Sequence, residues 1–210
     1  MSDLDLSLYL VTDPGLSRGR SYEFMVEEAV KGGVTVVQLR EKNLSSRKFY
    51  ELAKSLMSLL KPMNIPLIIN DRLDIALAVD ADGLHIGQSD LPYHIARKLL
   101  GKDTIIGLSV ETIEQAREAN RLDVDYIGLS PVFSTNTKRD INRPLGLSGV
   151  KEIASFTKHK TVGIGGINNA NAKSVIASGA HGVAVVSAIV SHDNPRKAAS
   201  ELKTIIDSAK

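Results

Sequence analysis

The chain has 210 residues, 43% of them hydrophobic and 24% charged, and its 26 basic residues nearly balance 24 acidic ones. This composition is typical of one globular domain, and the near-zero net charge argues against a nucleic-acid partner. The absence of cysteine excludes disulfides, cysteine-bound zinc and a thiol nucleophile. No run approaches about 18 apolar residues and the N-terminus is acidic, so we expect a cytoplasmic protein with no membrane partner.

Short apolar runs alternate with segments of helical periodicity along the whole chain. The runs predict buried parallel strands, because they are short and mostly lack apolar–polar alternation. We expect strands at residues 8–11, 34–39, 66–69, 83–86, 104–108, 126–129, 161–164 and 183–186. We expect helices at residues 21–31, 45–60, 72–79, 92–100, 111–120, 148–156, 170–178 and 194–208.

This alternation predicts an α/β fold, namely a single small (β/α)8 TIM barrel spanning residues 1–210. Each strand–helix unit takes about 26 residues, near the minimum for a βα repeat. An open doubly wound sheet shows the same alternation, but here the count reaches eight with no leftover segment. Residues 131–147 form a long irregular stretch, and such a loop in a compact domain is more often functional than idle.

Basic residues follow the second predicted strand, at the end where (β/α)8 barrels place their chemistry. Gln38, Arg40 and Lys42 alternate, so they share one face of the strand. A guanidinium beside an ammonium suits a diphosphate, and solvated surface charges are the alternative.

Two carboxylates, Asp71 and Asp90, follow the third and fourth predicted strands. Magnesium takes one or two carboxylates and completes its shell with water and phosphate oxygens. The pair therefore predicts a magnesium site. The alternatives are a helix N-cap for Asp90 and an ion pair with Arg72 or Lys42 for Asp71.

Gly165 and Gly166 follow the seventh predicted strand, and a turn at residues 185–188 follows the eighth. Glycines let backbone N–H groups approach a phosphate, and these two loops form the recurrent phosphate site of such barrels. The loop with Thr135, Thr137 and Lys138 is either a lid over the phosphates or a plain surface loop.

The histidines have no metal-pair spacing, and the chain has no nucleophile-elbow motif. His85 lies in a predicted buried strand, so we expect it to be structural. The inventory therefore contains anion sites and a cation site without a nucleophile or an obvious base.

Six segments resemble, in order and spacing, the motifs of the thiamine phosphate synthase family. They are residues 38–42, 69–74, 81–92, 128–138, 163–167 and 186–189. The resemblance implies a transferase that joins a hydroxymethylpyrimidine diphosphate to a thiazole phosphate, forming thiamine phosphate and pyrophosphate. It also implies a dissociative mechanism, in which pyrophosphate leaves before the thiazole nitrogen attacks.

The resemblance also implies a role for each matching residue. Gln38 would contact the aminopyrimidine, and Asp71 and Asp90 would bind one Mg²⁺ per subunit. The diphosphate would be held by Arg40, Lys42, Asn70, Ser109 and Lys138, all but Asn70 also acting in catalysis. The thiazole phosphate would meet Thr135, Thr137, Gly166, Val186 and Ser187. The partners would be these small phosphorylated substrates, and a homo-oligomer stays open.

The sequence departs from the family pattern at Glu111, where the family often has a histidine. A thiazole tautomerase that resembles this family uses a histidine in that region, so Glu111 counts against that activity. Glu111 would then only favour a helix N-terminus. The sequence leaves two further functions open. One is a phosphosugar-type isomerase or aldolase that shares only the Gly165–Gly166 cup, and the second is a non-catalytic regulator that binds thiazole or thiamine phosphate.

Overall fold

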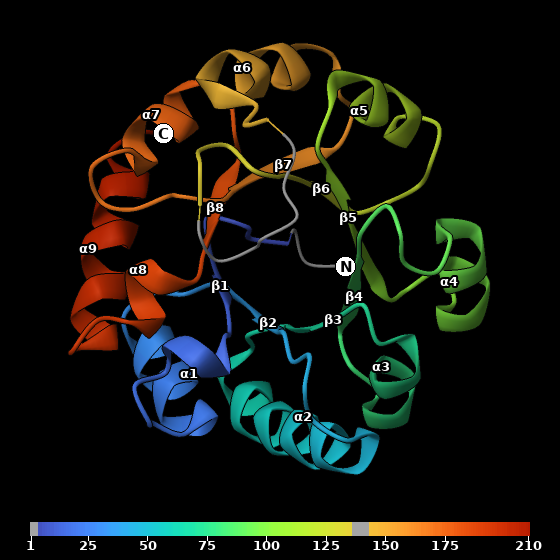
Figure 1. Cartoon of the computed structure of the whole chain (residues 1–210), viewed down its shortest axis with the longest axis vertical. Helices are drawn as coiled ribbons and strands as arrows, with labels where there is room; N and C mark the ends of the chain where they lie inside the picture. Colours follow the sequence, from blue (N-terminus) through green and yellow to red (C-terminus); the bar gives the residue numbers. More distant parts are fainter. Residues whose placement is uncertain (1–3, 136–142) are drawn as a thin grey trace.

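The computed structural model describes residues 4–135 and 143–210, which form a closed barrel of eight parallel strands surrounded by helices (Figure 1). Each strand pairs with its neighbour in sequence, and β1 closes the barrel against β8. The strands are β1 (Leu8–Val11), β2 (Val36–Leu39), β3 (Leu67–Asn70), β4 (Gly83–Ile86), β5 (Ile105–Val110), β6 (Tyr126–Leu129), β7 (Lys160–Ile164) and β8 (Gly182–Val185). The closure confirms the predicted (β/α)8 barrel and rejects the open sheet.

The helices alternate with the strands and form the outer layer in Figure 1. They are α1 (Tyr22–Lys31), α2 (Ser46–Leu60), α3 (Leu73–Val79), α4 (Tyr93–Leu100), α5 (Ile113–Ala119), α6 (Gly146–Phe156), α7 (Ala172–Ala177), α8 (Ser187–Val190) and α9 (Pro195–Asp207). Two short 3₁₀ turns lie at Pro14–Leu16 and Lys61–Met63. Helix α8 is too short for a periodic pattern, which is why its first residues look like a turn in the sequence.

Side-chain caps explain where several helices begin. Ser21 accepts the N–H of Phe24 at the start of α1, and Thr112 accepts the N–H of Gln115 at the start of α5. Because Thr112 is the N-cap, Glu111 lies before α5. The expectation that residue 111 begins this helix is therefore wrong.

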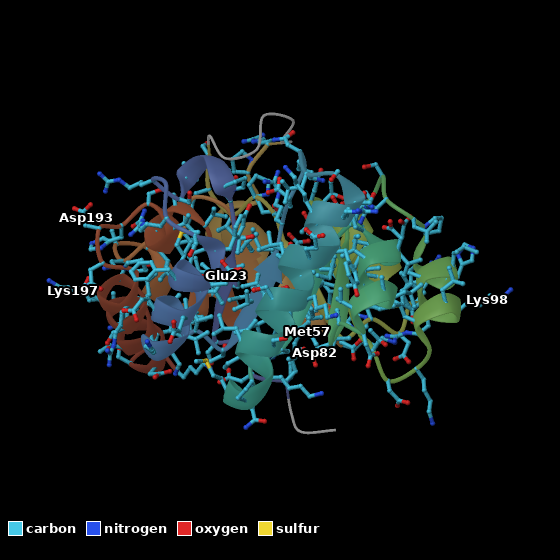
Figure 2. The ribbon with its side chains drawn as sticks, turned by 90° about the horizontal axis from the view of Figure 1, so that it is seen from below. Glu23, Met57, Asp82, Lys98, Asp193 and Lys197 are labelled. Carbon is cyan, nitrogen blue, oxygen red and sulfur yellow. The ribbon has the colours of Figure 1, made fainter. Side chains whose placement is uncertain are left out.

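The alternation of side chains along each strand creates two apolar layers. Leu8 and Leu10 of β1 pack in the cluster shared with the helices, whereas Tyr9 and Val11 belong to a second cluster inside the barrel. Figure 2 shows the barrel from the side, with Asp82, the residue before β4, toward the lower rim. The carboxyl ends of the strands therefore form the opposite rim. Within the described ranges, no helix is long and apolar enough to cross a membrane.

Candidate active site

The end of β2 carries the two predicted cations, and each contacts a carboxylate from a neighbouring strand end. Nη1 of Arg40 lies 3.3 Å from Oδ2 of Asp13, which follows β1. Nζ of Lys42 forms an ion pair with Asp71, which follows β3. The backbone N–H of Arg40 donates to Oγ1 of Thr12 at 3.0 Å, so the strand end is anchored to β1.

Glu41, between the two cations, points the other way and is buried. The hydroxyl of Tyr22 donates to its Oε2 at 2.6 Å, and the N–H groups of Lys42 and Asn43 donate to its Oε1 at 2.8 and 3.0 Å. Burial, followed by the hydrogen bond to Glu41, raises the pKa of Tyr22. Glu41 therefore fixes the backbone turn that aims Arg40 and Lys42 at the rim.

The two predicted metal ligands come from the ends of β3 and β4. Asp71 has a φ of 60°, in the left-handed region, and its carboxylate accepts the side-chain amide of Asn70. Oδ2 of Asp90 accepts the N–H of Gly87 at 2.7 Å. Burial raises the pKa of Asp90, the Gly87 N–H opposes this shift, and the neighbouring carboxylate of Asp71 raises the pKa further. The two carboxylates are therefore close enough to interact.

The structure decides between the alternative roles predicted for the two carboxylates. Asp90 is not a helix N-cap, because Pro92 holds that position before α4. Asp71 does pair with Lys42, whereas Arg72 pairs with Asp74 at 2.6 Å. Among residues 4–135 and 143–210, no three His, Cys, Asp or Glu side chains form a metal-binding group. Two carboxylates alone fit Mg²⁺, which takes its other ligands from water and phosphate.

The turn after β7 needs its glycines because the loop after β6 lies against it. Gly165 and Gly166 have φ values of 98° and 65°. A Cβ on Gly166 would lie 2.8 Å from both Cβ of Phe133 and the carbonyl oxygen of Ser134. The N–H of Phe133 also donates to the carbonyl of Gly165 at 3.2 Å. The two loops thus form one packed unit at the carboxyl rim.

Val186 follows the last residue of β8, and Ser187 is the first residue of α8. Strand β8 pairs with β7. Val186 precedes α8, and its carbonyl accepts the N–H of Val190 at 2.8 Å. The strand order thus brings Gly166, Val186 and Ser187 to neighbouring strand ends, as predicted. Thr135 is described, whereas the predicted lid residues Thr137 and Lys138 lie outside the described residues.

Gln38 and Ser109 lie deeper, inside the barrel mouth, and are joined through His85 and through two tyrosines that the sequence did not single out. Nε2 of Gln38 donates to Oη of Tyr9 at 2.9 Å, and the hydroxyls of Tyr9 and Tyr126 lie 2.8 Å apart. Nδ1 of His85 lies 2.9 Å from Oη of Tyr126, and its Nε2 lies 2.8 Å from Oγ of Ser109. His85 is buried as expected, but it also contacts a predicted substrate-binding residue.

The sequence contains only a weak indication that Tyr9 and Tyr126 take part in the site. The chain has only five tyrosines, and these two lie inside apolar strands, where a phenol needs a hydrogen-bond partner. The partner comes from a strand far away in the sequence, so the pairing becomes visible only when the barrel closes.

Cations, carboxylates and a glycine-lined turn lie together at the carboxyl rim of this closed (β/α)8 barrel. These features are typical of the class of barrel enzymes with phosphorylated substrates. A family model described as "Thiamine monophosphate synthase" matches residues 8–189. The chain therefore belongs to the thiamine monophosphate synthase family, as the resemblance implied, and has the transferase class of that family.

Individual relatives agree with this family. The thiamine-phosphate synthase of Clostridium novyi is 49% identical over 97% of this chain and 100% of its own length. The one from Syntrophomonas wolfei is 52% identical over 98% of both chains. The solved structure of thiamine phosphate pyrophosphorylase from Pyrococcus furiosus has a TM-score of 0.90 at 38% identity, covering 99% of this chain and 98% of that one. Sequence and fold thus point to the same enzyme family.

Proposed function

We propose that this chain joins 4-amino-2-methyl-5-(diphosphooxymethyl)pyrimidine to 4-methyl-5-(2-phosphooxyethyl)thiazole, yielding thiamine phosphate and pyrophosphate. The observation that carries the proposal is that Lys42 interacts with the carboxylates of Asp71 and Asp90 at the ends of β3 and β4, while Arg40 follows the same strand as Lys42. A diphosphate bound with a divalent cation requires both signs of charge in one place. An isomerase of a phosphate monoester, or a regulator, has no need of this combination.

The diphosphate is bound in this proposal by Arg40, Lys42, Asn70, Ser109 and Lys138. Arg40 is the more buried of the first two, since its side chain is 20% exposed and that of Lys42 is 52% exposed. Arg40 is thus held in place by Asp13, while Lys42 is able to move from Asp71 to the substrate. Both residues then neutralise charge that grows on the leaving group.

Asp71 and Asp90 would hold one Mg²⁺. The raised pKa of Asp90 supports this assignment, because burial and then the neighbouring Asp71 carboxylate disfavour its negative charge, and a bound cation would offset both effects. When bound, the ion supplies positive charge to the diphosphate oxygens. Asn70 keeps the Asp71 carboxylate oriented by donating its side-chain amide.

The reaction requires no nucleophile or base from the protein. The bond between the pyrimidine methylene carbon and the diphosphate oxygen breaks, and pyrophosphate takes the electron pair. The thiazole nitrogen then supplies the pair for the new carbon–nitrogen bond. The protein contributes electrostatic stabilisation and alignment. The thiazole phosphate is bound in this proposal by Thr135, Thr137, Gly166, Val186 and Ser187.

The decisive assay mixes both substrates with and without Mg²⁺ and measures pyrophosphate and thiamine phosphate. We expect both products in equal amounts, and only with Mg²⁺. Lys42→Ala should lower kcat/KM by about 100-fold, as removal of one transition-state donor does. Lys98→Ala is the matched control, since Lys98 is exposed on α4 at the outer edge of the molecule (Figure 2). Thiazole phosphate isomerisation without pyrophosphate would instead identify a tautomerase.

A substitution of Lys138 tests the electrostatic role of the predicted lid loop. If its ammonium neutralises the departing pyrophosphate, Lys138→Ala lowers turnover more than substrate affinity. Equal losses in both would refute that role. The cytoplasmic location stays a prediction from the sequence, and a homo-oligomer stays open.

A further inference from the structure

The barrel interior contains a continuous series of hydrogen-bonded side chains, which we call the interior chain: Gln38, Tyr9, Tyr126, His85 and Ser109. We propose that the interior chain sets the hydrogen-bonding polarity of its two ends, so that Gln38 presents an acceptor and Ser109 presents a donor to the substrate. Tyr9, Tyr126 and His85 are then positioning residues. This inference rests on the proposed function, in which both ends meet the pyrimidine diphosphate.

The polarity follows from counting protons from the Gln38 end. Nε2 of Gln38 donates to Oη of Tyr9 at 2.9 Å. A phenol has one proton, so Tyr9 gives its own to Oη of Tyr126, 2.8 Å away. Tyr126 has then accepted one bond and gives its proton to Nδ1 of His85, 2.9 Å away.

The histidine passes this polarity to the serine. A neutral imidazole that accepts at Nδ1 has its proton on Nε2. Nε2 of His85 therefore donates to Oγ of Ser109 at 2.8 Å, and the serine keeps its own proton for another acceptor. Burial raises the pKa of Tyr9 and of Tyr126, so both phenols remain protonated at neutral pH.

The barrel is built to hold these rings in place. A Cβ on Gly107 would lie 2.1 Å from Cζ of Tyr126, and a Cβ on Gly128 would lie 3.3 Å from Cε1 of His85. The ring of Tyr126 lies against those of Tyr9 and His85, with centroids 5.8 and 5.6 Å away. Both tyrosines are completely buried. Such close packing favours the observed arrangement of the three rings.

The two ends match the two parts of the proposed substrate. The exocyclic amine of the pyrimidine is a donor, and Gln38 accepts it at Oε1 while one of the two N–H groups of Nε2 donates to Tyr9. Diphosphate oxygens are acceptors, and Ser109 offers them its proton. If the Gln38 amide were reversed, every bond in the interior chain would reverse, and Ser109 would donate to His85 instead. Both contacts with the substrate would then be mismatched.

The first test measures the tautomer of His85 directly, by ¹⁵N NMR of the imidazole in the intact, unliganded protein. We expect the proton on Nε2, with Nδ1 unprotonated. A proton on Nδ1 would overturn the inference. Because no turnover is involved, this result is independent of whether the proposed synthase reaction is detected.

The second test is Tyr126→Phe, which keeps the ring and removes the phenol from the middle of the interior chain. We expect KM for the pyrimidine diphosphate to rise about tenfold, the value of one well-made hydrogen bond, while KM for the thiazole phosphate stays unchanged. Tyr93→Phe is the control, because it removes a phenol that donates to the carbonyl of Asp123 at 2.7 Å on the outer layer.

Two kinetic results would contradict the inference. Equal changes in both KM values, or a lower melting temperature with unchanged kinetics, would indicate a purely structural role for Tyr126. If Tyr126→Phe does not fold, the tautomer of His85 in the unaltered protein still decides the question.

Discussion

Gly107→Ala tests whether the interior of the barrel is packed around Tyr126 as closely as the structure shows. An added Cβ would lie 2.1 Å from Cζ, 2.4 Å from Oη and 2.6 Å from Cε1 of the Tyr126 ring. The ring would have to leave its position, because a Cβ atom essentially never lies within 3.0 Å of a non-bonded atom. Gly107 does not have a positive φ, so crowding rather than backbone conformation sets the penalty.

The expected loss of stability has two parts. Overpacking a closed core costs about 1–3 kcal/mol. Displacing Tyr126 also breaks its hydrogen bonds with Tyr9 and His85, at about 1 kcal/mol each. The sum, about 3–5 kcal/mol, is a large share of a domain stability of about 5–15 kcal/mol. For a chain of this size it corresponds to a fall in melting temperature of about 6–20 °C.

The assay is thermal unfolding followed by circular dichroism, with a double-mutant cycle. Gly19→Ala is the control, since Gly19 has a φ of 78° and nothing within 4 Å of its added Cβ, so only backbone strain is expected. In a Tyr126→Leu background the penalty of Gly107→Ala should shrink, because the ring atoms are gone. In a Tyr126→Phe background it should persist. A penalty independent of residue 126 would refute the reasoning.

Three further predictions concern charges around the barrel. Asp90→Asn should stabilise the metal-free protein at pH 7 by less than about 1 kcal/mol, because it removes a carboxylate whose charge is disfavoured by burial and then by Asp71. A lower melting temperature would contradict this. Burial and two nearby lysines lower the pKa of His181 below its usual 6.5, so the unfolded chain binds this proton more tightly. Stability should fall as pH drops through about 6.5, and His181→Asn should flatten this slope in melting temperature against pH. Arg20 donates to the carbonyl of Val190 at 2.7 Å, at the end of α8, so Arg20→Ala should raise KM for the thiazole phosphate selectively.

The secondary structure was largely predictable because strand and helix patterns are local. Residues 83–86 and 126–129 form strands with the predicted limits, since polar residues or turns border both apolar runs. The missed helix α8 spans four residues, less than two turns, so no amphipathic repeat exists to reveal it. Helix α5 begins at Ile113, two residues after the predicted start, because Thr112 rather than Glu111 caps its first turn.

The residues at the rim of the site were predictable for a different reason. In a (β/α)8 barrel the carboxyl ends of all strands meet at one rim, so the residues that follow the strands are expected there. Once the fold is known, Arg40, Lys42, Asp71 and Asp90 are expected at the same rim because each follows a barrel strand, and Lys42 pairs with Asp71 there. No such rule locates a contact inside the strands. The bond between Tyr9 and Tyr126 joins residues 117 positions apart, and the alternation of each strand specifies only a face.

The rim residues were predictable and the interior contacts were not, and this difference follows from the chemistry of the two halves of the proposed substrate. A diphosphate is recognised by net charge, so charged residues at strand ends suffice, and their type is visible in the sequence. A neutral aminopyrimidine is recognised by the direction of its hydrogen bonds, which depends on which atom of an amide or imidazole has a proton. Gln38, the residue proposed to contact the ring, acquires that direction only from neighbours on other strands. The residue types therefore predict where the substrate binds, while the closed barrel is needed to explain how its ring is oriented.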